Sequence, residues 1–434
     1  MIPIPAGASA RSRLLPFSVP FRYFGAAAAF HVLAWGALLA GAEAFADFGG
    51  GLGPVFAALH LITLGVLATA AVGASLQLLP IATRQPVRSV GAAKLIWWFM
   101  VPGTGLFALG AGLHAPRMMA PGAMLALGGL AVYGWLLAEN LRRAQGLRVV
   151  ILYGWAALGA LALAAASGLA LVARYEHGLD LDHGAFRAAH LVLAAYGFMG
   201  LLAMGLSQFL LPMFALAPAP APRTARFALG LAAAGILLAT VSLLLVPSRA
   251  GLAIAAALGL AAALAHVVSM ERALARRMPR PLGPAFLLMR VSWACLIASL
   301  LLGGWIALGS APARSELLFG VLLVPGWLLS FVLAVLQRIV PFLATVHAGG
   351  GTRPAPLVSA LTPTGPLAAH RLLHLAALAG LIAAAATGAT VLAQLAAATG
   401  LAAAAAFAVF FVHTLLRLRE ARLPAQPAGL RGRP

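Results

Sequence analysis

The chain repeats one apolar motif three times, and this repeat limits the possible folds more than any other feature. The three copies end at Pro80, Pro212 and Pro341, which are 132 and 129 residues apart. They read HLITLGVLATAAVGASLQLLP, LVLAAYGFMGLLAMGLSQFLLP and FGVLLVPGWLLSFVLAVLQRIVP. A membrane-spanning helix needs roughly 20 apolar residues, so each repeat has room for about four of them. The sequence therefore predicts three four-helix units with a pseudo-threefold organisation.

Each copy of the motif carries small and polar residues at matching distances before its proline. A glycine lies fifteen residues before, a small residue seven before, and a glutamine three or four before: Gly65, Gly73 and Gln77; Gly197, Gly205 and Gln208; Gly326, Ala334 and Gln337. The glycines either permit close helix contact or leave room for a flat ligand. We expect the glutamines to bond across helices. The prolines are expected to mark the inner helix ends, because proline lacks a backbone donor.

The composition indicates a polytopic membrane protein. Of the residues, 63% are hydrophobic and 9% are charged, and the mean hydropathy is +1.00, too apolar for a soluble surface. The formal net charge of +20 comes from basic residues dispersed between apolar runs, so no nucleic-acid partner is expected. Cys295 is the single cysteine, which excludes an intrachain disulfide and a cysteine-ligated iron–sulfur cluster.

Twelve apolar runs are long enough to span a bilayer. They lie near residues 22–45, 54–81, 91–113, 118–140, 149–173, 186–214, 225–247, 250–270, 284–308, 316–345, 367–392 and 394–416. Basic residues gather before the first run and in every second loop, whereas most acids fall in the alternate loops. The positive-inside rule therefore places both termini in the cytoplasm. We predict cytoplasmic tails at 1–20 and 419–434, and a single twelve-helix membrane domain at 21–418.

The single lysine, set against 28 arginines and abundant alanine and glycine, is typical of a GC-rich bacterial genome. The predicted location is therefore the bacterial inner membrane, with the lipid bilayer as the first partner.

His60 and His190 are the first candidates for cofactor binding. They lie 20 and 22 residues before their prolines, toward the outer side in two equivalent repeats. Ionisable groups inside membranes are costly and favour a functional role. A neutral imidazole is the usual axial ligand of b-type haem. The alternatives are a hydrogen-bonded packing histidine for His60 and an interfacial one for His190.

Two further histidine pairs suggest metal binding. His370 and His374 are four residues apart and share a helix face, a spacing that suits a metal ion or two ring contacts. His177 and His183 lie in an acidic outer loop, which is either a copper or zinc site or a solvated polar loop. His31 is isolated in its span and is interpreted as structural.

Twelve spans in three units, with histidines at the outer ends of the second and sixth, resemble the haem–copper oxidase subunit I superfamily. The opening FSVPFRYF resembles that of the NnrS proteins, which are linked to nitric oxide responses, and QRIVPFLATVHA resembles an uncharacterised bacterial branch. The resemblance implies haem b and copper as cofactors. His60 matches the position of a low-spin haem ligand, and His190 is the nearest match to a copper ligand.

The sequence also departs from that family. The seventh span lacks the histidine pair for copper, the apolar core of the tenth lacks histidines, and the NnrS pattern HxHEM is absent. Acids are nearly absent from the spans, with Glu139 close to an inner end. A complete oxygen or nitric oxide reductase is therefore not expected.

The leading hypothesis is a membrane protein that binds haem, copper or both. It would act in electron transfer, metal handling or nitric oxide response, with respiratory-chain proteins as partners. The alternatives are a transporter, although the commonest carriers repeat in halves, or a cofactor-free assembly factor for a respiratory complex. The sequence predicts no oligomeric state.

Overall fold

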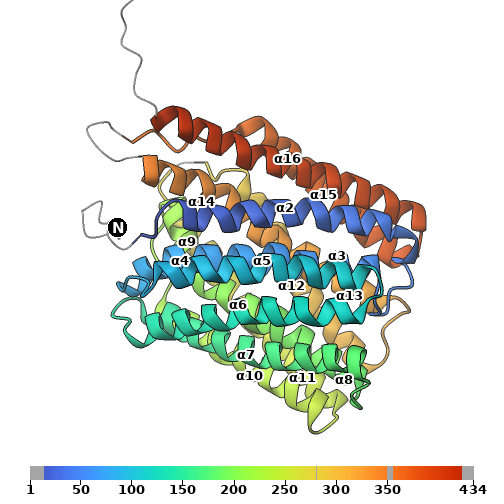
Figure 1. The fold of residues 1–434 in the computed structure, drawn as a ribbon. Helices are drawn as coiled ribbons and strands as arrows, with labels where there is room; N and C mark the ends of the chain where they lie inside the picture. Colours follow the sequence, from blue (N-terminus) through green and yellow to red (C-terminus); the bar gives the residue numbers. More distant parts are fainter. Residues whose placement is uncertain (1–13, 280, 349–354, 423–434) are drawn as a thin grey trace, which may run out of the picture.

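The computed structural model describes residues 14–279, 281–348 and 355–422. Within these residues all regular structure is helical, and twelve helices are long and apolar enough to cross a membrane (Figure 1). A helix satisfies its own backbone hydrogen bonds, so apolar runs of this length are stable in lipid as helices. The predicted all-α, twelve-span fold is confirmed. The outer parts of the predicted tails, 1–13 and 423–434, lie outside the described residues.

The helices form three successive units. Unit 1 contains α2 (Ser18–Ala40), η1 (Ala42–Ala44), α3 (Pro54–His60), η2 (Leu61–Ala68), α4 (Thr69–Thr83), α5 (Val90–Gly112) and α6 (Pro116–Arg142). Unit 2 contains α7 (Arg148–His177), α8 (His183–Leu191), η3 (Val192–Gly200), α9 (Leu201–Ala215), α10 (Pro222–Leu244) and α11 (Arg249–Ala275). Unit 3 contains α12 (Ala285–Leu308), α13 (Ser315–Val321), η4 (Leu322–Leu329), α14 (Ser330–Ala348), α15 (Thr364–Thr387) and α16 (Thr390–Arg422).

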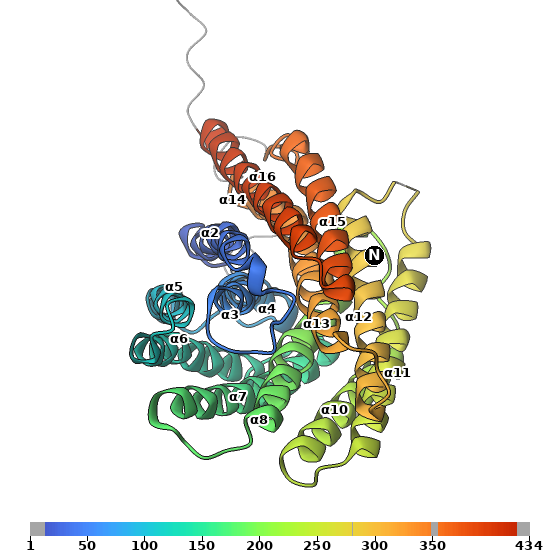
Figure 2. The same cartoon turned by 90° about the vertical axis from the view of Figure 1, so that its right-hand side faces the viewer.

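The three units close into a ring. In each unit the third and fourth helices pack as a hairpin: α5 on α6, α10 on α11, and α15 on α16. Neighbouring units meet where α6 packs on α7 and α11 on α12, and α16 returns to pack on α2. Seen end-on, α3–α4 and α13 lie near the centre of the ring, and α8 lies between α7 and α10 (Figure 2). These motif helices are also the most buried of the twelve spans.

Each motif helix contains a π-helical segment at the same place. These segments are η2, η3 and η4, and they begin 19, 20 and 19 residues before the motif prolines. A π-helix is rare and is found mostly at functional sites. Its recurrence in all three units confirms that the sequence repeat is a structural repeat.

The predicted role of the motif prolines is wrong. Pro80 and Pro212 lie inside α4 and α9, which continue to Thr83 and Ala215. Pro341 likewise lies inside α14, which continues to Ala348. A proline costs one ladder hydrogen bond and kinks a helix, and here tertiary packing holds the following residues helical despite that loss. Residues with left-handed backbone end the first two helices, Arg84 at φ 59° and Leu216 at φ 51°.

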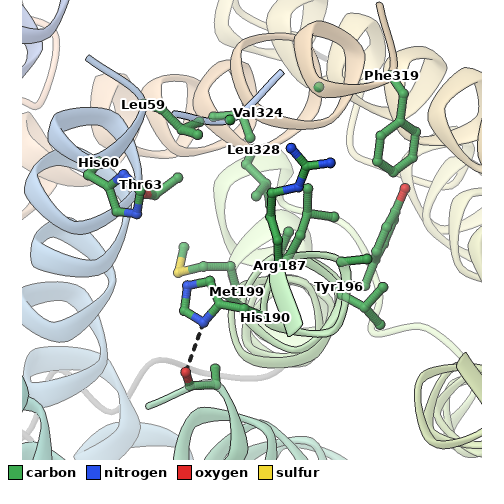
Figure 3. A pocket seen from close by; sticks show the side chains of 18 of the residues that line it. Leu59, His60, Thr63, Arg187, His190, Tyr196, Met199, Phe319, Val324 and Leu328 are labelled. Carbon is green, nitrogen blue, oxygen red and sulfur yellow. Dashed lines mark hydrogen bonds between the residues drawn. The ribbon is translucent and has the colours of Figure 1, made fainter. Parts of the chain in front are cut away.

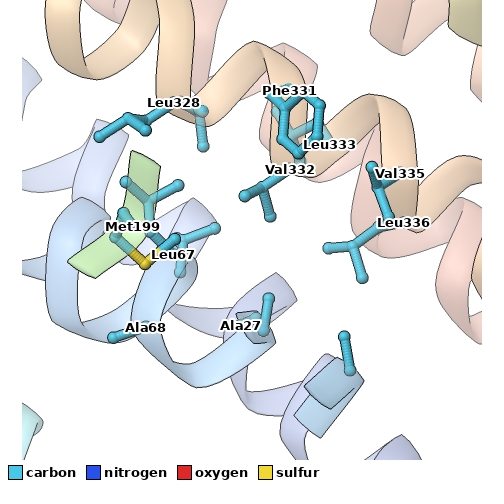
Figure 4. Packing of buried hydrophobic residues seen from close by; sticks show 14 of the residues in the cluster. Ala27, Leu67, Ala68, Met199, Leu328, Phe331, Val332, Leu333, Val335 and Leu336 are labelled. Atoms are coloured by element: carbon cyan, nitrogen blue, oxygen red, sulfur yellow. The ribbon is translucent and has the colours of Figure 1, made fainter. Parts of the chain in front are cut away.

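The centre of the molecule is apolar and follows the repeat. Leu67, Met199 and Leu328 each lie thirteen residues before a motif proline, one in each π-helical segment. All three belong to one buried cluster, in which η4 contacts both η2 and η3 (Figure 4). Equivalent residues of the three units therefore belong to the same buried core.

The motif glycines serve helix packing. A Cβ at Gly65 would lie 2.7 Å from the Phe30 ring, and one at Gly197 would lie 2.7 Å from the Ala160 side chain. At Gly326 the obstacle is the Cys295 sulfur, at 2.9 Å. Of the two predicted roles, close contact therefore applies, and these three glycines seat the motif helix on the first helix of each unit.

Candidate functional site

A large cavity opens between the motif helices of units 1 and 2 and continues toward unit 3. Its volume is about 830 Å³, within the range of roughly 300–1,000 Å³ typical of small-molecule and cofactor sites. Most of its walls are apolar. The ionisable and hydroxyl side chains among its lining residues are His60, Thr63, Tyr175, His183, Arg187, His190, Tyr196, Ser299 and Glu316.

His60 is the last residue of α3, directly before η2. Its Nδ1 lies 3.0 Å from the carbonyl oxygen of Phe56, one turn earlier. The ring also packs against the rings of Phe56 and Phe107, with centroids 4.2 Å and 5.0 Å away. Because a carbonyl oxygen only accepts, Nδ1 carries the proton of the neutral ring, and Nε2 keeps its lone pair. The imidazole is thus held in one tautomer and one orientation.

His190 lies near the end of α8, two residues before η3, and is held in the same way. Its Nδ1 lies 2.9 Å from the carbonyl oxygen of Ala164 on α7, and 3.3 Å from the Ser167 hydroxyl. A dashed line in Figure 3 marks a hydrogen bond of this ring. The carbonyl again assigns the proton to Nδ1, so Nε2 keeps its lone pair. The structure therefore brings both predicted histidines to one cavity, each with the unprotonated nitrogen available.

Arg187 is a further charged residue of the site that was not predicted from the sequence. It precedes His190 by three residues, which places both on the same side of α8, and this spacing was the available signal. Its guanidinium faces Glu316 of unit 3, with Nη2 3.8 Å from Oε2, and both side chains line the cavity. Figure 3 shows Arg187 beside His190. Arg187 and Glu316 are the charged residues of the lining.

An aromatic surface forms part of the wall beyond His190. Tyr196 in η3 and Trp327 in η4 lie with ring centroids 5.4 Å apart and planes 30° apart. The Tyr196 hydroxyl shares a hydrogen bond of 2.9 Å with the Ser299 hydroxyl on α12. Trp327 lies over Gly200, where a Cβ would approach the indole to 2.9 Å. These residues come from units 2 and 3, so the chain order gave no sign of the surface.

His370 and His374 do share a helix face, as predicted. Their rings stack with centroids 5.5 Å apart, and both are fully buried. The structure adds His31 from α2, whose ring centroid lies 6.1 Å from that of His370. His31 is alone in its span, as the sequence indicates, but in space it joins the two histidines of α15 at the place where α16 packs on α2.

The outer-loop pair has dissimilar surroundings. His177 ends α7 as an exposed side chain, 3.8 Å from a Glu176 oxygen. His183 begins α8, packs edge-on against Tyr175 with centroids 5.7 Å apart, and lines the cavity. Across the described ranges, no group of three or more His, Cys, Asp or Glu side chains is placed to hold a metal ion.

Glu139 and two of the three motif glutamines have structural partners, whereas Nε2 of Gln337 is buried without a hydrogen-bond partner among the described residues. Glu139 forms ion pairs with Arg88 at 2.8 Å and Arg143 at 3.2 Å. Gln208 meets His266 of α11 at 3.4 Å, which confirms the expected bond across helices. Gln77 instead accepts a hydrogen bond from the backbone of Leu15.

The residues around the cavity fit a haem better than a copper centre. Two oriented imidazoles offer Nε2 lone pairs, the walls are apolar, and Arg187 supplies a positive charge for an acidic substituent. A copper centre with three histidine or cysteine ligands needs a further such side chain beside them, and across the described residues no group of three His, Cys, Asp or Glu side chains is placed to hold a metal ion. The sulfur atoms in the lining are methionine thioethers, such as that of Met199.

Comparison with solved structures finds a similar fold. A chain in the cryo-EM structure of a haem–copper terminal oxidase dimer matches with a TM-score of 0.59 and 12% sequence identity. The match covers 95% of this chain and 85% of that chain. No protein-family model matches the sequence, and neither does any curated protein. The chain is thus a multi-pass membrane protein whose fold is similar to that of a haem–copper oxidase and resembles subunit I.

Proposed function

We propose that this protein binds one haem b in the cavity, with His60 and His190 as the iron ligands. The observation that carries the proposal is the shared arrangement of the two imidazoles. Each lines the same cavity, and each has its Nδ1 bound to a backbone carbonyl, which leaves Nε2 as the ligand atom. Histidines that bind metals commonly donate their second nitrogen to a carbonyl in this way.

The chain's own residues prepare the cavity for such a ligand. The carbonyls of Phe56 and Ala164 hold the proton on Nδ1 and fix each ring. The apolar walls exclude water, and the Tyr196 and Trp327 rings add an aromatic surface. Arg187 is placed to face an anionic substituent at the rim. A bound haem supplies one-electron chemistry.

The use of both histidines as ligands favours electron transfer over gas reduction. A haem held by His60 and His190 together would supply one-electron chemistry rather than a binding site for oxygen or nitric oxide. This agrees with the missing histidines of spans seven and ten. We therefore propose electron transfer in the bacterial inner membrane, with a respiratory-chain protein as the partner, rather than a complete oxidase.

The test is a reduced-minus-oxidised visible spectrum of protein purified from a haem-replete host, with iron and haem measured on the same sample. We expect b-type bands and one haem per chain. His60→Ala and His190→Ala should each remove most of the bands. The matched control is His413→Ala, because His413 is exposed on α16 and lies outside the cavity lining.

Two results would overturn the proposal. One is a well-folded, haem-free wild-type protein, which would favour the transporter or assembly-factor alternatives. The other is a spectrum that is unchanged in the double variant His60→Ala, His190→Ala, which would place the haem elsewhere.

A further inference from the structure

Three buried histidines gather at the seam that closes the ring. His31 comes from α2 of unit 1, and His370 and His374 come from α15 of unit 3, with exposed fractions of 0%, 0% and 1%. Phe407 of α16 packs against the first two, at centroid distances of 6.1 Å and 5.1 Å. On each ring one nitrogen is buried and finds no hydrogen-bond partner within the described part of the chain: His31 Nδ1, His370 Nε2 and His374 Nδ1.

The hydrogen bond at Nε2 of His31 determines which nitrogen of that ring carries the proton. The indole nitrogen of Trp35 lies 3.0 Å from Nε2 of His31. An indole N–H only donates, so Nε2 is the acceptor, and Nδ1 carries the proton of the neutral ring. The unpartnered atom of His31 is therefore a donor.

His370 has the opposite pattern. Its Nδ1 lies 3.0 Å from the carbonyl oxygen of Ala403 on α16. A carbonyl only accepts, so Nδ1 holds the proton and Nε2 keeps a lone pair. The unpartnered atom of His370 is an acceptor.

The hydrogen bonds of the Ser330 hydroxyl determine which nitrogen of the His374 ring carries the proton. It lies 2.8 Å from Nε2 of His374 and donates to the carbonyl oxygen of Pro325 at 3.1 Å. Thr69 lies at the equivalent position of unit 1 and donates to Leu64 in the same way, at 2.9 Å. With the hydroxyl proton used on the carbonyl, Ser330 accepts from Nε2 of His374. Nδ1 of His374 then keeps a lone pair as a second acceptor.

One donor and two acceptors are the complement of a water molecule, which has two O–H donors and a lone pair. A buried unpartnered polar group costs about 1–3 kcal/mol, and a buried water typically makes about three hydrogen bonds. We propose that His31, His370 and His374 together bind one water molecule. It accepts from His31 Nδ1 and donates to His370 Nε2 and His374 Nδ1.

The same assignment argues against a three-histidine metal site. A metal ion needs a lone pair from every ligand, and Trp35 holds His31 in the tautomer whose free nitrogen is protonated. The water instead completes a hydrogen-bonded chain from Trp35 on α2 to Ser330 on α14. That chain joins unit 1 to unit 3 at the seam.

The first test is a structure of the intact protein at a resolution that shows ordered water, with copper and zinc measured on the same sample. We expect one solvent peak at roughly 2.7–3.2 Å from all three nitrogens and no stoichiometric metal. Bound copper or zinc at this position would overturn the proposal in favour of the metal site predicted for His370 and His374. A site without any peak would overturn it as well.

The second test reads the tautomers of the wild-type protein by nitrogen-15 NMR of labelled histidine. We expect the proton on Nδ1 in His31 and His370, and on Nε2 in His374. Single His→Phe variants assign the signals, with His413→Phe as the control that leaves all three unchanged. The opposite tautomer at any one of the three would contradict the assignment. Neither test depends on the haem.

Discussion

The backbone of Gly73 lies against the side chain of Tyr23, so closely that a Cβ added at Gly73 would lie 2.5 Å from the Tyr23 Cβ. In unit 2 the same distance separates an added Cβ at Gly205 from the Cβ of Tyr153. The second small position of the motif is therefore a contact between the first and second helices of a unit. A close helix approach of this kind is the main source of packing energy in lipid.

Replacing Gly73 by alanine should destabilise the protein. The added methyl group must push α2 away from α4 or distort one of them, and overpacking of this kind costs typically about 1–3 kcal/mol. Thermal unfolding in mild detergent measures the loss. The matched control is Gly128→Ala on α6, where a Cβ meets nothing within 4 Å. Equal unfolding temperatures for the two variants would contradict the close contact.

Tyr23 and Tyr153 make the same hydrogen bond in two units, and losing it should cost about the same in each. Their hydroxyls donate to the carbonyls of Ala93 and Ala225, at 2.7 Å and 3.0 Å. Tyr→Phe should cost about 1 kcal/mol at either site, and the two losses should add, because separate sites are independent. Unfolding in sodium dodecyl sulfate measures both single variants and the double. A strongly non-additive double variant would count against independent units.

The fold was predictable because bilayer thickness and the repeat leave few alternatives. All twelve spans were located. The twelfth, predicted at 394–416, is longer and covers Thr390–Arg422, and the first, predicted at 22–45, is shifted to Ser18–Ala40. There the apolar run continues past Gly41, but residues 42–44 form the short helix η1 instead. Apolar character marks a span, and it does not show where the backbone turns.

The π-helical segments and the true helix ends were not predictable. A π-helix differs from an α-helix in which carbonyl each N–H reaches, and the apolar pattern of η2 is the same for both. Proline predicted helix ends at Pro80 and Pro212, yet each helix continues for three more residues. Packing within the bundle decided both features, and local propensity gives no information about that packing.

The candidate site was predictable in part. Depth in the membrane led to His60 and His190, because both precede a motif proline by about the bilayer thickness. The aromatic surface and the seam cluster join residues from different units: Tyr196 with Trp327, and His31 with His370. Contacts between units depend on how the ring closes, and a single sequence carries no signal for that.

Substitutions at Arg187 and Glu316 should change the haem affinity in opposite directions. If Arg187 holds an anionic substituent of the haem, Arg187→Ala should weaken haem binding about two- to fivefold, the effect of losing ~0.5–1 kcal/mol at an exposed ion pair. Glu316→Gln removes the competing carboxylate, 3.8 Å from the guanidinium, and should strengthen binding by a similar factor. Haem titration of the haem-depleted protein measures both.

The control for this pair is Arg174→Ala. Arg174 is an outer-side arginine that donates to the carbonyls of Leu179 and Leu181 and lies outside the cavity lining. It should leave haem affinity unchanged. Affinity losses of equal size for Arg174→Ala and Arg187→Ala would point to a general effect of charge at the outer face, and would contradict a specific role for Arg187.

Reporter cysteines should show which face of the bundle meets the cytoplasm. Cys295 is buried against Gly326, so the wild-type chain should react little with a maleimide. Asp180 is exposed in an outer loop of the predicted topology, and Ala219 is exposed in an inner one. If basic loops stay inside, Asp180→Cys should react with a membrane-impermeant maleimide in intact spheroplasts, and Ala219→Cys only after permeabilisation. The reverse pattern would invert the predicted orientation and place His60 and His190 on the cytoplasmic side.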